Sequence, residues 1–111
     1  MNTQLVVILQ DLNAKETQQI SIEMHDFLIL GRNIHITHVA FPNDLTISSQ
    51  HCRLMYNAGV MYLEDLHSTN GTYLNGTKLV GKEEVHPGDI LIIGKESLQV
   101  MWSIEATRFE E

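Results

Sequence analysis

Apolar and polar residues alternate with a period of two along most of the chain. The alternation is clearest in two neighbouring segments, with Cys52, Leu54 and Tyr56 on one face of the first and Met61 and Leu63 on one face of the second. Successive side chains of a β-strand point to opposite faces of its sheet, so this period predicts strands that bury one face. No stretch of ten or more residues carries apolar residues at helical spacing. The pattern therefore predicts a chain built from strands.

Further strands are expected on both sides of these two segments, with turn-forming residues between them. They lie at residues 4–10, 20–24, 27–31, 90–94 and 98–104. Clusters of Gly, Asn and Pro separate the segments, and this composition marks turns. Several short strands separated by such turns predict an all-β sandwich.

The length and composition fit one globular domain. The chain has 111 residues, of which 43% are hydrophobic, and a domain of this size can bury a core. We expect the domain over residues 1–104, followed by a polar tail over residues 105–111 that frays or leads into another domain. The single cysteine, Cys52, excludes an internal disulfide and is expected in the core.

The apolar runs are too short for membrane insertion. None approaches the roughly 18 residues of a membrane span, and the apolar run near the N-terminus is not preceded by the basic residues of a secretory signal. Together with the single cysteine, this predicts a reduced, cytoplasmic setting.

The charge balance bears on the class of partner. Fourteen acidic residues stand against seven basic ones, which gives a formal net charge of −7. Binding to a phosphate backbone needs a basic face, and the basic residues form no cluster in the sequence. We therefore expect no nucleic-acid partner, and any anionic ligand must be captured by local geometry.

Three polar spots are candidates for a shared site. Arg32 follows Gly31 at the end of an apolar strand, where it is either a solvated side chain or a planar fork of donors that captures an anion. Ser48 lies in a loop, where its hydroxyl either bonds the local backbone or binds a ligand oxygen. His51 is expected to be buried and to hold this loop by hydrogen bonds. The carboxamide of Asn70 offers both a donor and an acceptor, which suits a clamp on an extended peptide.

The stretch HSTNGTYLNG, residues 67–76, contains Asn-Gly-Thr twice. Asn-Gly favours the tight turns of β-hairpins, so Asn70-Gly71 and Asn75-Gly76 are predicted to form the two turns of a compact hairpin. Both copies are also formal N-glycosylation sequons. Because no secretory signal is seen, we interpret them as turns.

Taken together, four motifs resemble the forkhead-associated (FHA) domain, a phosphothreonine-reading module. They are LGR (30–32), SSQH (48–51), LEDLHSTNGTYLNG (63–76) and PGDILIIG (87–94), and the resemblance runs from about residue 4 to residue 104. It implies a sandwich of about eleven mostly antiparallel strands with recognition loops at one end. It also implies a protein that binds without catalysis and needs no cofactor or metal.

The resemblance also implies roles for individual residues. Arg32 and Ser48 match the phosphate contacts, and Thr69 is placed to help at the phosphate through its hydroxyl or its backbone. Asn70 matches the position at which family members bind the peptide main chain. The remaining matches are structural: Gly31, His51, Asp65, Gly71 and Gly76.

The sequence departs from the family pattern at Ser49. Many members carry a basic or amide residue there; a serine hydroxyl still donates to a phosphate but lacks the charge. Specificity in the family often depends on the residue three after the phosphothreonine. We expect the loop 40–47 and the segment after Asn75 to contact this peptide residue. Asp44 would disfavour an acidic residue at that peptide position, and Lys78 would favour one.

The predicted function is therefore a non-enzymatic signalling module. Its partner would be a phosphothreonine-containing protein or peptide, such as a Ser/Thr kinase or a kinase substrate. The alternative is a degenerate FHA-like scaffold or oligomerisation domain that binds independently of phosphate, which Ser49 and the acidic charge favour. A third hypothesis is that Thr17 or Thr107, in segments expected to be flexible, becomes phosphorylated and docks on another copy.

Catalytic and metal sites find little support in the sequence. His35 and His38 have an odd separation, which would place them on opposite faces of a strand rather than around one metal. No acidic residue is placed to orient a base beside the nucleophile-type side chains of residues 48–52. GTYLNGTK lacks the spacing of a nucleotide-binding loop and no helix pattern follows it.

Overall fold

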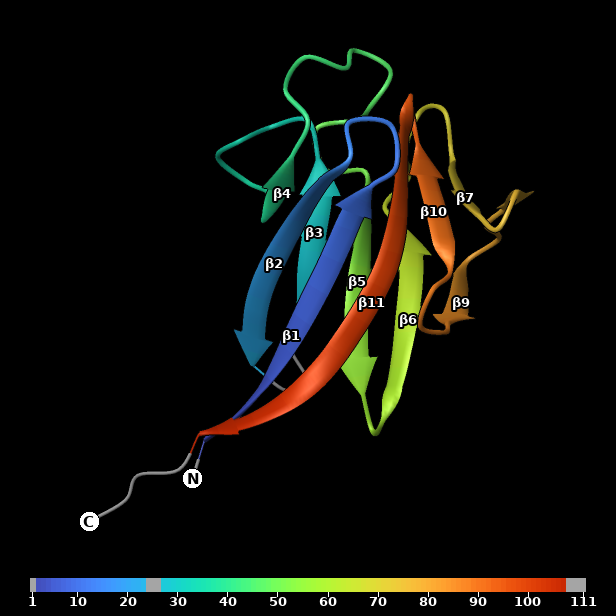
Figure 1. Ribbon diagram of the computed structural model, residues 1–111. Coiled ribbons are helices and arrows are strands. Elements are labelled where there is room, and N and C mark those ends of the chain that lie inside the picture. The colour runs from blue at the N-terminus through green and yellow to red at the C-terminus, as the bar shows by residue number, and fades with distance from the viewer. Residues whose placement is uncertain (1, 24–26, 108–111) are drawn as a thin grey trace.

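The protein is described here by a computed structural model that covers residues 2–23 and 27–107, and this part of the chain folds into eleven strands (Figure 1). The strands are β1 (Asn2–Asp11), β2 (Glu16–Glu23), β3 (Phe27–Gly31), β4 (Val39–Ala40), β5 (Cys52–Asn57), β6 (Val60–Asp65), β7 (Thr72–Leu74), β8 (Thr77–Lys78), β9 (Lys82–Val85), β10 (Ile90–Ile93) and β11 (Glu96–Thr107). Within the described ranges, no helix is long and apolar enough to cross a membrane.

The strands form two sheets that pack face to face. The six-stranded sheet has the order β2-β1-β11-β10-β7-β8, and the five-stranded sheet has the order β4-β3-β5-β6-β9. All neighbours pair antiparallel except β3 and β4, which are parallel. The predicted sandwich of about eleven mostly antiparallel strands is confirmed.

The inner faces of the two sheets carry the alternating apolar residues. On β5 and β6 the predicted face is buried, since Cys52, Leu54 and Leu63 have no exposed surface and Met61 has 1%. The largest fully buried side chains come from both sheets and include Leu5, Leu9, Leu28, Leu30, Leu91, Ile93 and Leu98. Cys52 is a free, buried thiol, and burial raises its pKa. Its expected place in the core is confirmed.

The connections between the sheets' strands gather the polar motifs at one end of the sandwich. The β3–β4, β4–β5 and β6–β7 loops lie there, beside the β1–β2 and β10–β11 turns (Figure 1). The β5–β6 hairpin and the far ends of β1 and β11 lie at the opposite end. Most consecutive strands reverse direction, so loops far apart in the sequence lie at the same end of the sandwich.

The structure corrects the expected double hairpin. Asn75 and Gly76 do form a tight turn, with φ of 50° and 84°, between the paired strands β7 and β8. Asn70 and Gly71 instead lie in the connection from β6 in one sheet to β7 in the other. Gly71 has a φ of 86°, so the same dipeptide supplies the positive φ of a crossover here.

The C-terminal boundary also differs from the expectation. β11 continues to Thr107, whose backbone lies opposite Asn2 of β1, so residues 105–107 belong to the sheet. The rest of the expected tail, residues 108–111, lies outside the described residues. Thr17 lies in β2 opposite Gln10. Both threonines proposed for self-docking therefore lie in paired strands.

Candidate functional site

A pocket of about 330 Å³ lies at the loop end of the sandwich. It draws on three connections, β3–β4, β4–β5 and β6–β7, and is lined by Arg32, Leu45, Thr46, Ile47, Ser48, Ser49, Thr69 and Asn70. The five candidate ligand contacts Arg32, Ser48, Ser49, Thr69 and Asn70 are thus brought together, although they span almost forty positions of the sequence. Arg32 is the one cationic side chain in this lining.

The end of β3 and the serine loop are joined directly through their backbones. The Arg32 N–H donates to the Ser48 carbonyl at 3.0 Å, and the Asn33 N–H donates to the Ser49 carbonyl at 3.2 Å. Gly31 makes this approach possible. A Cβ on Gly31 would lie 2.3 Å from the Ser49 carbonyl oxygen and 2.9 Å from its carbon. These are backbone atoms, so the loop itself would have to move.

A Gly31→Ala substitution is expected to lower the free energy of unfolding by about 2 kcal/mol, because overpacking forces a backbone shift. Chemical denaturation measures this. Gly59→Ala offers a contrast, because a Cβ there meets nothing within 4 Å but Gly59 has a φ of 83°; its cost is backbone strain alone. Unchanged stability of the Gly31 variant would contradict the close packing.

His51 ties two of the three loops together from inside the domain. Its side chain is fully buried. The Ser48 N–H donates to His51 Nδ1 at 3.0 Å, and His51 Nε2 lies 2.8 Å from the Gly71 carbonyl oxygen. Because Nδ1 accepts, the proton resides on Nε2 and is donated to that carbonyl. One neutral imidazole thereby fixes Ser48 relative to the β6–β7 crossover.

Asp65 organises the crossover from the other side. Its carboxylate accepts from the Ser68 N–H at 3.0 Å, the Ser68 hydroxyl at 2.5 Å and the Thr72 hydroxyl at 2.7 Å. Burial alone would raise the pKa of Asp65, but these hydrogen bonds outweigh it and the pKa lies below its usual value. Ser68 also accepts from the Gly71 N–H at 2.9 Å. Ser68 was not among the predicted site residues, although it directly precedes Thr69.

A hydrogen bond between Ser48 and Thr69 joins the β4–β5 loop to the β6–β7 connection at the pocket. The Thr69 N–H donates to Ser48 Oγ at 3.0 Å, so this backbone group is occupied and only the Thr69 hydroxyl remains for a ligand. Ser48 accepts in this bond and keeps its own O–H for donation. Ser48 therefore offers a hydrogen-bond donor in the same lining as Arg32.

Asn70 is engaged within the protein. Its Nδ2 donates to the Thr46 carbonyl at 2.9 Å, rather than pointing free toward a ligand. The carboxamide oxygen and the second N–H are still able to pair with a peptide backbone. Thr46 was not a predicted site residue, yet it forms the pocket wall opposite Asn70.

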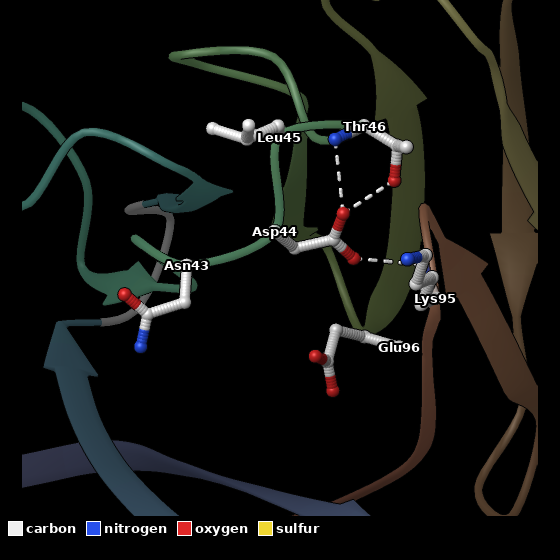
Figure 2. A pocket seen from close by; sticks show the side chains of 6 residues that line it. All are labelled: Asn43, Asp44, Leu45, Thr46, Lys95 and Glu96. Carbon is white, nitrogen blue, oxygen red and sulfur yellow. Dashed lines mark hydrogen bonds between the residues drawn. The ribbon is translucent and has the colours of Figure 1, made fainter.

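Lys78 and Asp44 do not face the pocket. Lys78 is exposed on β8 and its stem crosses Gly71, where an added Cβ would lie 2.6 Å from Lys78 Cε. Asp44 accepts from the Thr46 and Lys95 N–H groups at 2.9 and 2.8 Å and from the Thr46 hydroxyl. Neither side chain lines this pocket, and Asp44 instead lines a neighbouring hollow with Lys95 and Glu96 (Figure 2). Their expected influence on the peptide residue three after the phosphothreonine therefore stays a prediction.

A crowded set of carboxyl groups lies beside the site. Burial, followed by the neighbouring carboxyl groups of Asp11 and Asp44, raises the pKa of Glu96 to about 7. The pKa of Asp11 is lowered, chiefly by the Ala14 N–H that donates to it at 3.0 Å. Of the two carboxyl groups, Glu96 therefore keeps its proton to higher pH. No group of three or more His, Cys, Asp or Glu side chains within the described ranges could hold a metal ion.

This raised pKa predicts a pH-dependent stability. Unfolded Glu96 ionises near 4.5 and folded Glu96 near 7, so the unfolded state loses its proton first and stability falls as pH rises through this window. A Glu96→Gln variant should melt at higher temperature than wild type at pH 8 and show little gain at pH 4. Glu83→Gln, an exposed change of the same charge, is the control. Equal gains at both pH values would contradict the assignment.

Comparison with known proteins identifies the fold independently. Residues 28–94 match the family model of the FHA domain. Among curated relatives, FHA domain-containing protein FhaB of Mycobacterium tuberculosis is 40% identical over 53 residues, which are 48% of this chain and 34% of that protein. Protein FraH of Nostoc is 33% identical over 60 residues, which are 52% of this chain and 21% of FraH. The chain matches about a third or less of the length of these relatives.

Solved structures agree with the sandwich. A structure from a study of phosphothreonine-dependent FHA domain interactions is 28% identical, with a TM-score of 0.73 and coverage of 86% of this chain and 95% of the other. The FhaA FHA domain complexed with the intracellular domain of Rv3910 is 28% identical, with a TM-score of 0.70 and coverage of 85% and 98%. The FHA domain of CT664 from Chlamydia trachomatis, at 20% identity, shares the fold with a TM-score of 0.77 and coverage of 86% and 96%.

Proposed function

The chain belongs to the FHA domain family, and from that premise we propose that it is a non-enzymatic module that binds phosphothreonine peptides at the three-loop pocket. The observation that carries the proposal is the meeting of Arg32, Ser48 and Asn70 around one hollow. The similar structures include one described through phosphothreonine-dependent interactions.

The pocket's chemistry suits a phosphate dianion. A phosphothreonine carries a charge of about −1.5 to −2 and three strong acceptor oxygens. The Arg32 guanidinium would donate two parallel hydrogen bonds to these oxygens, and the Ser48 hydroxyl would add a third. Ser49 and the Thr69 hydroxyl lie in the same lining and would complete the donor set.

Asn70 would set the register of the peptide backbone. Its carboxamide oxygen accepts a peptide N–H while its Nδ2 stays on Thr46 or exchanges that carbonyl for one from the peptide. Lys78 lies outside this lining and would contact only a peptide that continues over Gly71 toward β8. No step in this binding breaks a covalent bond.

The proposed partner is a protein that displays a phosphothreonine in an extended segment, such as a Ser/Thr kinase or a kinase substrate in the cytoplasm. A phosphate-independent scaffold is the second candidate, favoured by Ser49 in place of a basic residue and by the net charge of −7. The two differ in one measurable property, the effect of the phosphate on affinity.

Paired peptides with and without phosphate on one threonine test the proposal. In calorimetric titrations at fixed salt we expect saturable binding of the phosphorylated member and at least 100-fold weaker binding of the other. A phosphoserine version reports how far the threonine methyl matters. Equal affinity for phosphorylated and unphosphorylated members would replace the proposal with the scaffold function.

A further inference from the structure

The six-stranded sheet carries apolar residues on its outer face as well as on the face that packs against the other sheet. In β10, Leu91 and Ile93 belong to the core, so Ile90 and Ile92 point outward, where they are half-buried. β1 follows the same pattern, with Ile8 on the outer face. An antiparallel sheet with one face in water normally alternates apolar and polar residues. The continuous apolar runs of β1 and β10 therefore indicate strands that are covered on both faces.

The strand register joins these residues into one surface, which we call the outer six-stranded face. Ile8 lies opposite Met101, and Ile92 lies opposite Tyr73. In Figure 1, β1, β2 and β11 lie in front of β3 and β5, so this face is turned toward the viewer. Met101 is 42% exposed there. The apolar members of the face are Val6, Ile8, Tyr73, Ile90, Ile92 and Met101.

The polar residues among these apolar ones are neutral wherever the structure describes their side chains. They are Gln10, Thr17, Ser97, Gln99 and Ser103. Charged positions lie at the margins, where the register places Lys78 opposite Tyr73 on the edge strand β8 and both Glu23 and Glu105 opposite Gln4 at the far end. The centres of protein–protein interfaces are depleted of charged residues and enriched in Tyr and Met. A neutral surface on a chain with a net charge of −7 therefore indicates a contact surface.

The outer face of the five-stranded sheet differs, because charged side chains cover its aromatic rings. The Arg53 guanidinium lies 5.7 Å from the centroid of the Phe27 ring and pairs with Glu64 at 2.7 Å. Lys82 Nζ lies 4.9 Å from the centroid of the Tyr62 ring. Between residues 2–23 and 27–107, no ion pair or cation–π contact of this kind lies on the outer six-stranded face.

A second copy of the chain is the partner that this neutrality favours. A partner of opposite charge gains nothing from a face without charged groups, whereas two acidic copies repel each other least where neither presents a charge. Gln, Ser and Thr side chains each offer a donor and an acceptor. The same residues can therefore pair across a two-fold axis, as an isologous dimer requires.

The size of the face sets the strength of such a dimer. It spans about 20 Å along the strands and about 20 Å across five of them, from the rise and spacing of β-strands. Two stacked faces would bury on the order of 1,000 Å² in total, which is at the lower limit for specific interfaces. A weak association follows from this area.

We propose that the chain forms a weak symmetric dimer in which the outer faces of the two six-stranded sheets stack on each other. Its dissociation constant is on the order of 10 to 100 µM. The dimer does not depend on phosphopeptide binding. None of the residues that form the face lines the three-loop pocket, so both pockets of the dimer stay open.

Sedimentation equilibrium of the whole chain, from about 5 to about 500 µM, brackets this dissociation constant. We expect the average mass to rise from monomer toward dimer over the range. Higher salt should strengthen the dimer, because salt screens the repulsion between two acidic copies and leaves the apolar contact intact. A monomer at the highest concentration, or a dimer that salt dissociates, would overturn the proposal.

Met101→Lys assigns the contact to this face. The variant makes the net charge of −7 less negative by one and so reduces the overall repulsion, yet it should weaken dimerisation at least tenfold because an unpaired charge is buried in the interface. Ile36→Lys is the matched control, since Ile36 is 46% exposed on the β3–β4 loop and gains the same charge; it should dimerise at least as tightly as wild type. Ser103→Lys, at an exposed position of the same face, repeats the test with less effect on folding, and circular dichroism verifies that each variant is folded. Wild-type dimerisation in the folded Met101 and Ser103 variants, or an equal loss in the Ile36 variant, would place the contact elsewhere and overturn the proposal.

Discussion

Replacing Arg32 with alanine is expected to weaken phosphothreonine-peptide binding about 100-fold. Arg32 is the only cation that lines the three-loop pocket, and no side-chain hydrogen bond or ion pair occupies its guanidinium within the described part of the chain. Two charge-assisted hydrogen bonds to a phosphate contribute about 3 kcal/mol together, which corresponds to about two orders of magnitude in Kd. Calorimetric titration of one phosphopeptide into wild type and variant measures the loss.

The domain itself should tolerate this change, because the guanidinium lies at the rim and the backbone N–H that bonds Ser48 is retained. Arg53→Ala is the matched control. It removes the same charge from the outer face of the five-stranded sheet, where Arg53 pairs with Glu64 at 2.7 Å. We expect its phosphopeptide affinity to stay within threefold of wild type. Equal losses in both variants would mean that Arg32 acts through the overall charge, and the assigned contact would be wrong.

Replacing His51 with alanine is expected to lower the free energy of unfolding by about 4 kcal/mol. The substitution leaves a cavity and removes the partners of two groups, the Ser48 N–H and the Gly71 carbonyl. Cavity formation and loss of buried hydrogen bonds add to a cost of this size. Denaturant unfolding at constant pH measures it.

The His51 variant should also bind phosphopeptide poorly where it is still folded, because Ser48 is no longer held against the β6–β7 crossover. His86→Ala provides the comparison, since His86 is exposed and contacts Glu84 at the surface; its unfolding free energy should change by less than about 1 kcal/mol. A stable His51 variant with wild-type affinity would show that the buried imidazole does not position the serine loop.

The sandwich was predictable because burial of one sheet face imposes a period of two on the sequence. β5 and β6 show this directly, with Cys52, Leu54, Met61 and Leu63 in the core as expected. The crossover at Asn70-Gly71 was not predictable in the same way. A positive φ at glycine suits both a hairpin turn and a link between sheets, so the dipeptide alone does not say which strand follows.

The candidate site was predictable in its members but not in its internal bonds. Arg32, Ser48, Thr69 and Asn70 were named from motifs, and the structure places them in one lining. That the Thr69 N–H and the Asn70 carboxamide already bond within the protein follows from loop conformations, which no residue pattern encodes. The loop 40–47 was expected to contact the peptide, but the sequence did not single out Leu45 and Thr46 as its pocket-lining members, because a loop has no period that tells which side chains share a face.

Charge effects were the least predictable from the sequence. Asp44 and Lys78 were expected to set the preference for the peptide residue three after the phosphothreonine because of their charges. Their effect depends on which way the two side chains point relative to the bound peptide, and the sequence does not give that direction. The pairing of Glu96 with Asp11 joins residues at opposite ends of the chain through the adjacent strands β1 and β11. Only the sheet order brings these carboxyl groups together.

The most direct measurement is a map of backbone amide shifts during titration with a phosphothreonine peptide. Heteronuclear NMR of the labelled domain should show the largest changes at Arg32, Ser48, Thr69 and Asn70, small changes at Gly59 in the β5–β6 hairpin, and no response to the unphosphorylated peptide. Equal responses to both peptides, or changes centred on the outer sheet faces, would contradict phosphate recognition at the three-loop pocket.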